Sequence, residues 1–173
     1  PAEILANGFP YDKIVSWLWG NEDDLKRVCR EYFNYYNTYP DPNEDGWNSA
    51  TVALVKSSEL QRLAELTAKI MGGSEEVVPT EVWRYPLSKS SLPDVFYDLG
   101  DYINTYGDES QRSAYRQQLE RTIVFKAATS TFFGQRIPPD KFSGLSVYIP
   151  QTRWADMNSI YYQLDWARTV YGK

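Results

Sequence analysis

Residues 50–55 read ATVALV, an apolar run that predicts a β-strand. A strand with one face in water would alternate apolar and polar residues, so we expect this run to be buried on both faces of a sheet. The following residues 58–71 show helical periodicity, open with Ser58 and Gln61 in a capping-box pattern, and stop at a Gly-Gly pair. A buried strand that leads directly into an amphipathic helix is typical of an α/β fold.

The remaining secondary structure is predicted to be mainly helical. A helix that begins after Asn21 has an acidic first turn, which suits the positive end of the helix dipole, and should end before Pro40. Residues 144–149 (GLSVYI) predict a second strand. The other predicted helices are residues 93–106, 109–128 and 157–171, and residues 74–92 are expected to be irregular.

The composition excludes several kinds of chemistry. The 173 residues contain no histidine and one cysteine, Cys29, so this chain alone cannot build a Ser-His-Asp triad, a Cys-His dyad, a His-ligated zinc site or an intrachain disulfide. The net charge of -5 disfavours a nucleic-acid partner, because phosphate binding needs a basic surface. No apolar run approaches the ~20 residues of a membrane span. The opening PAEILANGFPYDK lacks an initiator Met and a signal peptide, so we expect a piece of a longer protein.

Two local features suggest reactive or metal-binding groups, and each has a simpler structural explanation. Cys29 falls in an apolar helical stripe, so we interpret it as a core residue rather than a nucleophile. Residues 41–46 (DPNEDG) match the first half of a calcium loop, but the twelfth position, which should be a bidentate Glu, is Val52. We therefore interpret the loop as a polar connection between a helix and a strand.

A carboxylate pair and abundant aromatic residues raise the alternative of a sugar site. Asp98 and Asp101 lie three residues apart on a predicted helix, which would place both carboxylates on one face. Such helix pairs usually form a solvated face, and nothing in the sequence shows a raised pKa. The aromatic residues are scattered through every predicted element, so we interpret them as core residues.

Four segments resemble the clostripain family of cysteine peptidases. They are PAEILANGFPY (residues 1–11), YDLGDYI (residues 97–103), GLSVYIP (residues 144–150) and YYQLDWA (residues 161–167). The strand–helix pair ATVALVKSSELQRLAEL (residues 50–66) fits the same scheme. Their order and spacing are similar to the C-terminal half of such an enzyme, and the resemblance extends over nearly the whole chain.

The resemblance implies an α/β fold, namely the C-terminal part of a caspase-like α/β/α sandwich with additional helices, helix-rich with a few buried strands. Residues 1–73 would belong to the sandwich, and residues 74–173 would be a mainly helical part that returns one strand near 144–149. The family uses a His–Cys catalytic dyad, and both the His and the Cys should lie upstream of residue 1. No catalytic residue is therefore expected within this chain.

The resemblance also implies where a substrate would bind. Family members cleave after Arg or Lys, and the segment that matches residues 1–11 borders their substrate cleft. By that position Ala2, Glu3 and Asn7 are candidates for substrate contact. The Glu3 carboxylate could face a basic side chain, or it could point away and hold its own loop. No cofactor is expected, although some members depend on calcium, and members are mostly secreted or cell-envelope proteins of bacteria.

Two hypotheses for the function follow. In the first, the chain is the C-terminal part of a clostripain-like cysteine endopeptidase, inactive alone, that completes the sheet and walls the substrate cleft. Its partners would be the N-terminal half of the same peptidase and a peptide or protein substrate. In the second, the chain is a non-catalytic glycan- or peptide-binding module on a degenerate peptidase fold.

Overall fold

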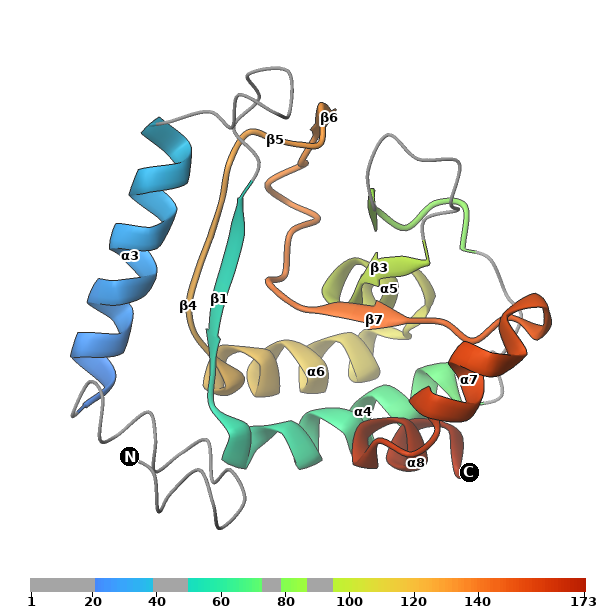
Figure 1. The fold of residues 1–173 in the computed structure, drawn as a ribbon. Helices are drawn as coiled ribbons and strands as arrows, with labels where there is room; N and C mark the ends of the chain where they lie inside the picture. Colours follow the sequence, from blue (N-terminus) through green and yellow to red (C-terminus); the bar gives the residue numbers. More distant parts are fainter. Residues whose placement is uncertain (1–20, 39–49, 73–78, 87–94) are drawn as a thin grey trace, which may run out of the picture.

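The computed structural model describes residues 21–38, 50–72, 79–86 and 95–173 (Figure 1). In these ranges small antiparallel sheets pack on a layer of helices, which confirms the predicted α/β class. The helices and strands are α3 (Glu22–Thr38), β1 (Thr51–Val55), α4 (Leu60–Met71), β2 (Arg84–Tyr85), β3 (Phe96–Asp98), α5 (Leu99–Tyr106), α6 (Glu109–Thr122), β4 (Ile123–Ala128), β5 (Thr131–Phe132), β6 (Gln135–Arg136), β7 (Ser146–Tyr148), α7 (Ala155–Tyr161) and α8 (Asp165–Tyr171), with 3-10 turns at Ser57–Glu59 and Thr152–Trp154.

Helix α3 lies beside the ladder formed by β1 and β4 and packs against both strands (Figure 1). The side chain of Asn21 accepts a hydrogen bond from the backbone N–H of Asp24 (3.0 Å), so the predicted helix cap is present. In the acidic first turn, the Glu22 carboxylate lies 2.7 Å from Lys26 and 3.5 Å from Lys56, which connects β1 to the next turn. No residue of α3 is fully buried, so this helix covers the ladder from outside.

Strands β1 and β4 pair antiparallel, from Thr51 opposite Ala128 to Val55 opposite Ile123. All five residues of β1 are half-buried, so the expectation of a strand buried on both faces is wrong for the described structure. The physical reason is that Thr51, Val52, Ala53 and Val55 line an open cavity instead of packing against a second layer of described residues. The apolar sequence of β1 therefore provides more apolar surface than the described residues cover.

The predicted helix over residues 109–128 ends early, at Thr122, and the chain continues as strand β4. Residues 123–125 are Ile, Val and Phe, whose branched and aromatic side chains favour a pleated surface. Pairing with β1 supplies the long-range contacts that override the helical spacing. The backbone N–H of Lys56 also donates to the carbonyl of Thr122 (2.9 Å), which ties the end of β1 to the end of α6.

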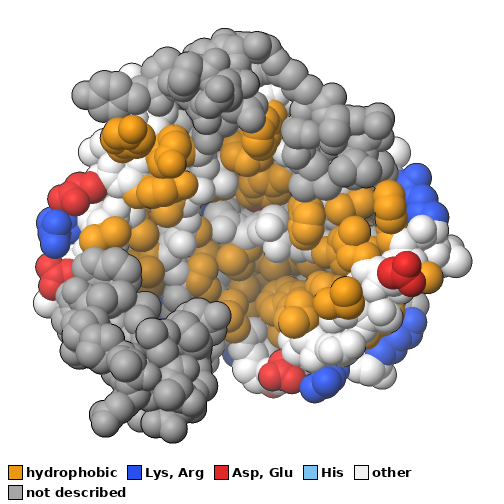
Figure 2. Space-filling view, viewed as in Figure 1, with side chains coloured by type: hydrophobic (Ala, Val, Ile, Leu, Met, Phe, Trp, Pro, Cys, Tyr) orange, Lys and Arg blue, Asp and Glu red, His pale blue; other side chains and the backbone are white. Residues whose placement is uncertain are grey.

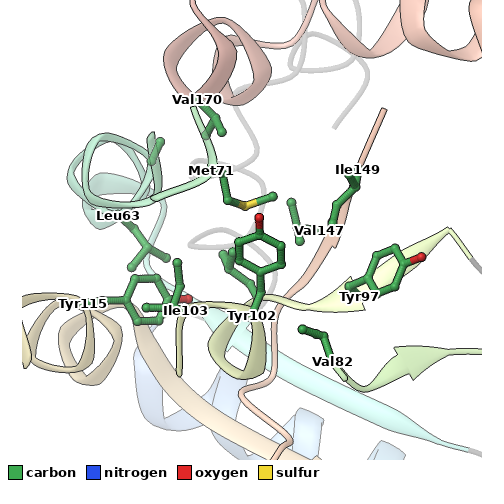
Figure 3. Close-up of a cluster of buried hydrophobic side chains, with 12 residues drawn as sticks. Leu63, Met71, Val82, Tyr97, Tyr102, Ile103, Tyr115, Val147, Ile149 and Val170 are labelled. Carbon is green, nitrogen blue, oxygen red and sulfur yellow. The ribbon is translucent and has the colours of Figure 1, made fainter. Parts of the chain in front are cut away.

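Helix α4 lies at the centre of the helical layer, between α6 and α8. Its apolar face is buried, as predicted from its helical spacing. The core that α4 shares with the small sheet appears in Figure 3. Its buried members are Leu63, Ala64, Met71, Val82, Tyr97, Leu99, Tyr102, Ile103, Tyr115, Val147, Ile149 and Val170. One core thus contains residues of both predicted parts of the chain, residues 1–73 and residues 74–173.

A three-stranded antiparallel sheet in the order β2–β3–β7 packs on this core. The predicted helix over residues 93–106 is in part a strand, because β3 ends at Asp98 and α5 begins only at Leu99. Strand β7 falls within the predicted strand 144–149. Because residues 74–173 also contain β2 to β6, the expectation of a single strand in this part is wrong.

Helix caps differ from the sequence pattern in one place. No side chain caps α4, so the predicted capping box at Ser58 and Gln61 is wrong, and residues 57–59 form a 3-10 turn instead. A capping box forms at α6, where Asp108 and Gln111 each accept the other's backbone N–H at 2.8 Å.

The predicted helix over residues 157–171 is divided into α7 and α8. Among the described helices, none combines the length and the apolar character that crossing a bilayer requires.

Candidate functional site

The N-terminus of α5 carries a buried carboxylate, Asp98, that joins three segments of the chain. Asp98 is the N-cap of α5, and its Oδ1 accepts the backbone N–H of Asp101 (3.0 Å). Its Oδ2 accepts the backbone N–H of Ser143 (2.8 Å) and the hydroxyl of Tyr85 (3.1 Å). The side chain is fully buried. A helix start, a β-strand and a distant loop are therefore fixed on one carboxyl group.

Asp101 forms a second connection one turn along the same helix. Its Oδ2 accepts the backbone N–H of Trp83 at 2.6 Å and lies 3.2 Å from the ammonium of Lys141. Lys141 also donates to the backbone carbonyl of Glu81 (2.8 Å). The two carboxylates, which we call the α5 carboxylate pair, thus hold residues 81–85 and residues 141–143 together.

The side chain of Ser143 closely approaches the backbone of the first turn of α5 at Gly100. The N–H of Gly100 donates to Ser143 Oγ (3.2 Å), and the N–H of Leu145 donates to the same oxygen (3.2 Å). A Cβ atom on Gly100 would lie 2.5 Å from the Cβ of Ser143, closer than real Cβ contacts allow. Glycine at this position is therefore required by the approach of the loop and not by its φ angle.

Burial sets the acidity of Asp98 and Tyr85. Loss of solvation raises the pKa of Asp98, and the backbone N–H groups of Ser143 and Asp101 only partly oppose that rise. Burial also raises the pKa of Tyr85 well above its usual value, and the nearby Asp98 adds to the effect. The expectation that Asp98 and Asp101 form a solvated face is wrong, because the loop at Ser143 and the strand at Tyr85 cover them.

Beside the α5 carboxylate pair lies an aromatic cavity of about 590 Å³. One wall is β1, and the rest of the lining includes Tyr85, whose hydroxyl donates to Asp98, and Gly144, which follows the Ser143 that Asp98 also holds. In Figure 2, hydrophobic side chains gather around a hollow on this face of the molecule. Its aromatic members are Tyr85, Phe96, Phe132, Phe133 and Phe142, and the described lining contains no charged residue. We call it cavity 1.

The residues predicted for substrate contact, Ala2, Glu3 and Asn7, lie outside the described residues, as does the loop at residues 41–46. Cys29 lies on α3 and is half-buried, and loss of solvation raises the pKa of its thiol. It is therefore less buried than predicted, but its environment is the opposite of what activates a thiol. No group of three Asp, Glu or Cys side chains with the geometry of a metal site occurs in the part of the chain that the structure describes.

Sequence reasoning missed Tyr85 and Ser143, which contact Asp98 from sequence distances of 13 and 45 residues. Asp98 itself carries a signal that could have found it, because Asp is among the residues most favoured at a helix N-cap. The arrangement offers hydrogen-bond acceptors and an apolar cavity. The sequence contains no histidine, so a Cys–His dyad cannot form within this chain, and loss of solvation raises the pKa of its one thiol.

Comparisons with protein-family models and with curated proteins find no match. Solved structures do match, and they are C11 cysteine proteases. An inactive zymogen C11 protease from Parabacteroides distasonis has a TM-score of 0.67 and 24% identity, over 86% of this chain and 43% of that chain. A clostripain from Bacteroides thetaiotaomicron, in complex with the peptide inhibitor BTN-VLTK-AOMK, has a TM-score of 0.65 and 25% identity, over 97% of this chain and 73% of that chain. A secreted C11 protease from the same species, iotapain, has a TM-score of 0.63 and 25% identity. The match covers 84% of this chain and 40% of that chain.

The chain therefore spans less than half the length of two of these solved chains. The helices and strands described here match the C-terminal part of these protease structures, which is the part that the sequence resemblance predicted. In its structure, this chain is similar to the C-terminal part of the caspase-like C11, or clostripain-family, cysteine proteases.

Proposed function

We propose that this chain is the C-terminal part of a clostripain-like cysteine endopeptidase that cleaves after Arg or Lys. The single observation that carries the proposal is the match to a clostripain over 97% of this chain. The His–Cys dyad would lie on the polypeptide that precedes residue 1, because this sequence contains no histidine. Catalysis by the whole enzyme would be attack by the cysteine thiolate, with histidine as acid and base.

Strand β1 supports a role in completing a larger sheet. It is apolar on both faces and only half-buried, and β4 is its one paired neighbour among the described strands. A strand edge with no neighbour among the described strands is suited to accept a further strand. The preceding polypeptide would supply that strand and, with it, the catalytic residues.

The specificity belongs to the proposal as well. The inhibitor bound to the Bacteroides clostripain contains the sequence VLTK, which places Lys beside its AOMK group. In this chain, Ala2, Glu3 and Asn7 are the proposed substrate contacts, and a Glu3 carboxylate would attract a basic side chain. Secretion is proposed from iotapain, which is a secreted protease. We propose no cofactor, so chelation of calcium should leave hydrolysis unchanged.

The test is hydrolysis of an Arg- or Lys-containing peptide by three preparations. They are this chain alone, the polypeptide encoded directly upstream of it, and the two mixed or expressed together. We expect cleavage only when both are present. Cleavage by this chain alone would contradict the proposal. If the upstream region encodes no His and Cys, the chain is instead the non-catalytic binding module.

A further inference from the structure

Helix α7 and the turn after it present apolar side chains to the solvent. Met157, Ile160 and Leu164 are 40%, 67% and 52% exposed, and they account for half of the exposed large hydrophobic residues in the described structure. Their spacing of three and four residues places them along one side of α7 and its continuation. Exposed apolar residues that occur singly need no explanation, but three on one face mark a contact surface.

These three residues form one wall of a second cavity, of about 470 Å³, which we call cavity 2. The opposite wall is β7, and Tyr161 and Trp166 are also part of the lining. No charged residue lines it among those the structure describes. A ligand recognised by charge would therefore find no partner here, whereas an apolar side chain would lose no hydrogen bond on entry.

Cavities 1 and 2 are parts of one continuous surface. Both are lined by Phe96 on β3, by Ser146 at the start of β7 and by Leu145 directly before it. Cavity 1 extends from there to β1, whose residues Thr51 to Ala53 and Val55 form its far wall. We call the whole surface, from β1 across β7 to α7, the apolar trough. In Figure 2 it coincides with the hydrophobic side chains around the central hollow.

We propose that the apolar trough is the docking surface for the polypeptide that makes up the rest of a C11-type peptidase, and that α7 forms the end of this interface farthest from β1. The inference rests on the proposed function and adds the partner's binding surface to it. More than half of the matched zymogen chain has no counterpart here, since this chain covers 43% of it. A partner of that size can cover a surface wider than one strand edge.

Two observations favour this occupant over others. The trough begins at β1, the strand that the proposed function already assigns to the preceding polypeptide, so one partner can cover both. The described residues that line the trough are also uncharged, in a chain with a net charge of -5, so apolar contact and shape rather than opposite charge would select the partner. The resulting interface would resemble a domain core divided between two polypeptides.

The experiment measures binding of this chain to the polypeptide encoded directly upstream, by titration calorimetry. Ile160→Glu introduces a charge into the trough at a side chain that is already 67% exposed, so the variant should fold. Gln163→Glu is the matched control, because it adds the same charge one turn away at an exposed residue that does not line either cavity. We expect Ile160→Glu to weaken binding at least about tenfold and Gln163→Glu to leave it unchanged.

The outcomes separate this inference from the proposed function. If the unmodified chain binds and restores hydrolysis while Ile160→Glu binds equally well, the trough inference is wrong and the proposed function stands. If the unmodified chain does not bind, both are wrong. If Ile160→Glu lowers the melting temperature of the chain alone, its own residues occupy the trough. If sedimentation shows that the chain forms a dimer and that Ile160→Glu dissociates it, the trough binds a second copy of the chain. The melting-temperature result and the dimer result would each overturn the inference.

Discussion

The hydroxyl of Tyr85 donates a 3.1 Å hydrogen bond to Asp98 Oδ2, an oxygen that also accepts the backbone N–H of Ser143. Tyr85 lies on β2 and lines cavity 1, while Asp98 caps α5 behind it. The carboxylate therefore couples the wall of the cavity to the start of a core helix. Because one buried carboxylate both caps α5 and holds Tyr85, substitution of a residue that donates to it should lower the stability of the protein.

Tyr85→Phe should destabilise the protein by about 1–2 kcal/mol, because a buried carboxylate loses one of its donors while the ring contacts are kept. Equilibrium unfolding in urea measures the effect. Tyr106→Phe is the control, since Tyr106 is exposed, and it should change stability by less than about 0.5 kcal/mol. Equal effects of the two substitutions would show that the Tyr85–Asp98 hydrogen bond contributes nothing.

The stability of the protein should depend on pH through Asp98. Burial raises the pKa of this carboxyl in the folded protein above its usual value of 3.8. The folded state then binds the proton more tightly than the unfolded state does. The contribution of this group to stability is therefore fully present below the unfolded pKa and is lost as the pH rises through the folded pKa.

Asp98→Asn removes this titration, so the stability of the unmodified protein relative to the variant should fall as the pH rises from 4 toward neutrality. One proton limits the slope of that difference to about 1.4 kcal/mol per pH unit. Urea unfolding of both proteins across this range provides the measurement. A difference that grows with rising pH would mean that the donors around Asp98 outweigh its desolvation and lower its pKa.

The sequence was sufficient for elements whose signals are local. The helix after Asn21 begins at its cap, and the helical face of residues 60–71 is buried as its spacing indicates. The strand at Ile123 was missed because its geometry depends on pairing with β1, about 70 positions earlier in the chain. The sequence identified Asp98 and Asp101 as a carboxylate pair but did not predict their buried contacts. Those contacts depend on Tyr85 and Ser143, which come close to Asp98 only in the folded chain.

Gly100→Ala should destabilise the protein although alanine is the better helix former. The new Cβ would lie 2.5 Å from the Cβ of Ser143, so the loop or the helix must move. The clash should cost about 1–3 kcal/mol, and helix propensity should return at most about 1 kcal/mol, so we expect a net loss of up to about 2 kcal/mol. Thermal and urea unfolding measure it. Adding Ser143→Gly should recover part of the loss, and no recovery would place the cause elsewhere.

Asp108→Ala and Ser58→Ala test the two candidate helix caps against each other. Asp108 forms the capping box at α6, so its loss should cost about 1 kcal/mol in urea unfolding. The side chain of Ser58 caps nothing in the structure, so Ser58→Ala should be close to neutral. The reverse order would favour the sequence pattern at residues 58 and 61 over the observed cap.

Cys29 should be a slow thiol. Partial burial raises the pKa of its thiol, so the thiolate fraction at pH 8 is smaller than that of a free cysteine. Alkylation by iodoacetamide in native buffer should therefore proceed more slowly than in urea, where the same chain is its own control. Cys29→Ala should leave the cleavage restored by the upstream polypeptide unchanged, because nucleophilic attack requires a thiolate that this site disfavours. Faster alkylation in the native protein than in urea, or loss of that cleavage, would instead identify Cys29 as an activated nucleophile.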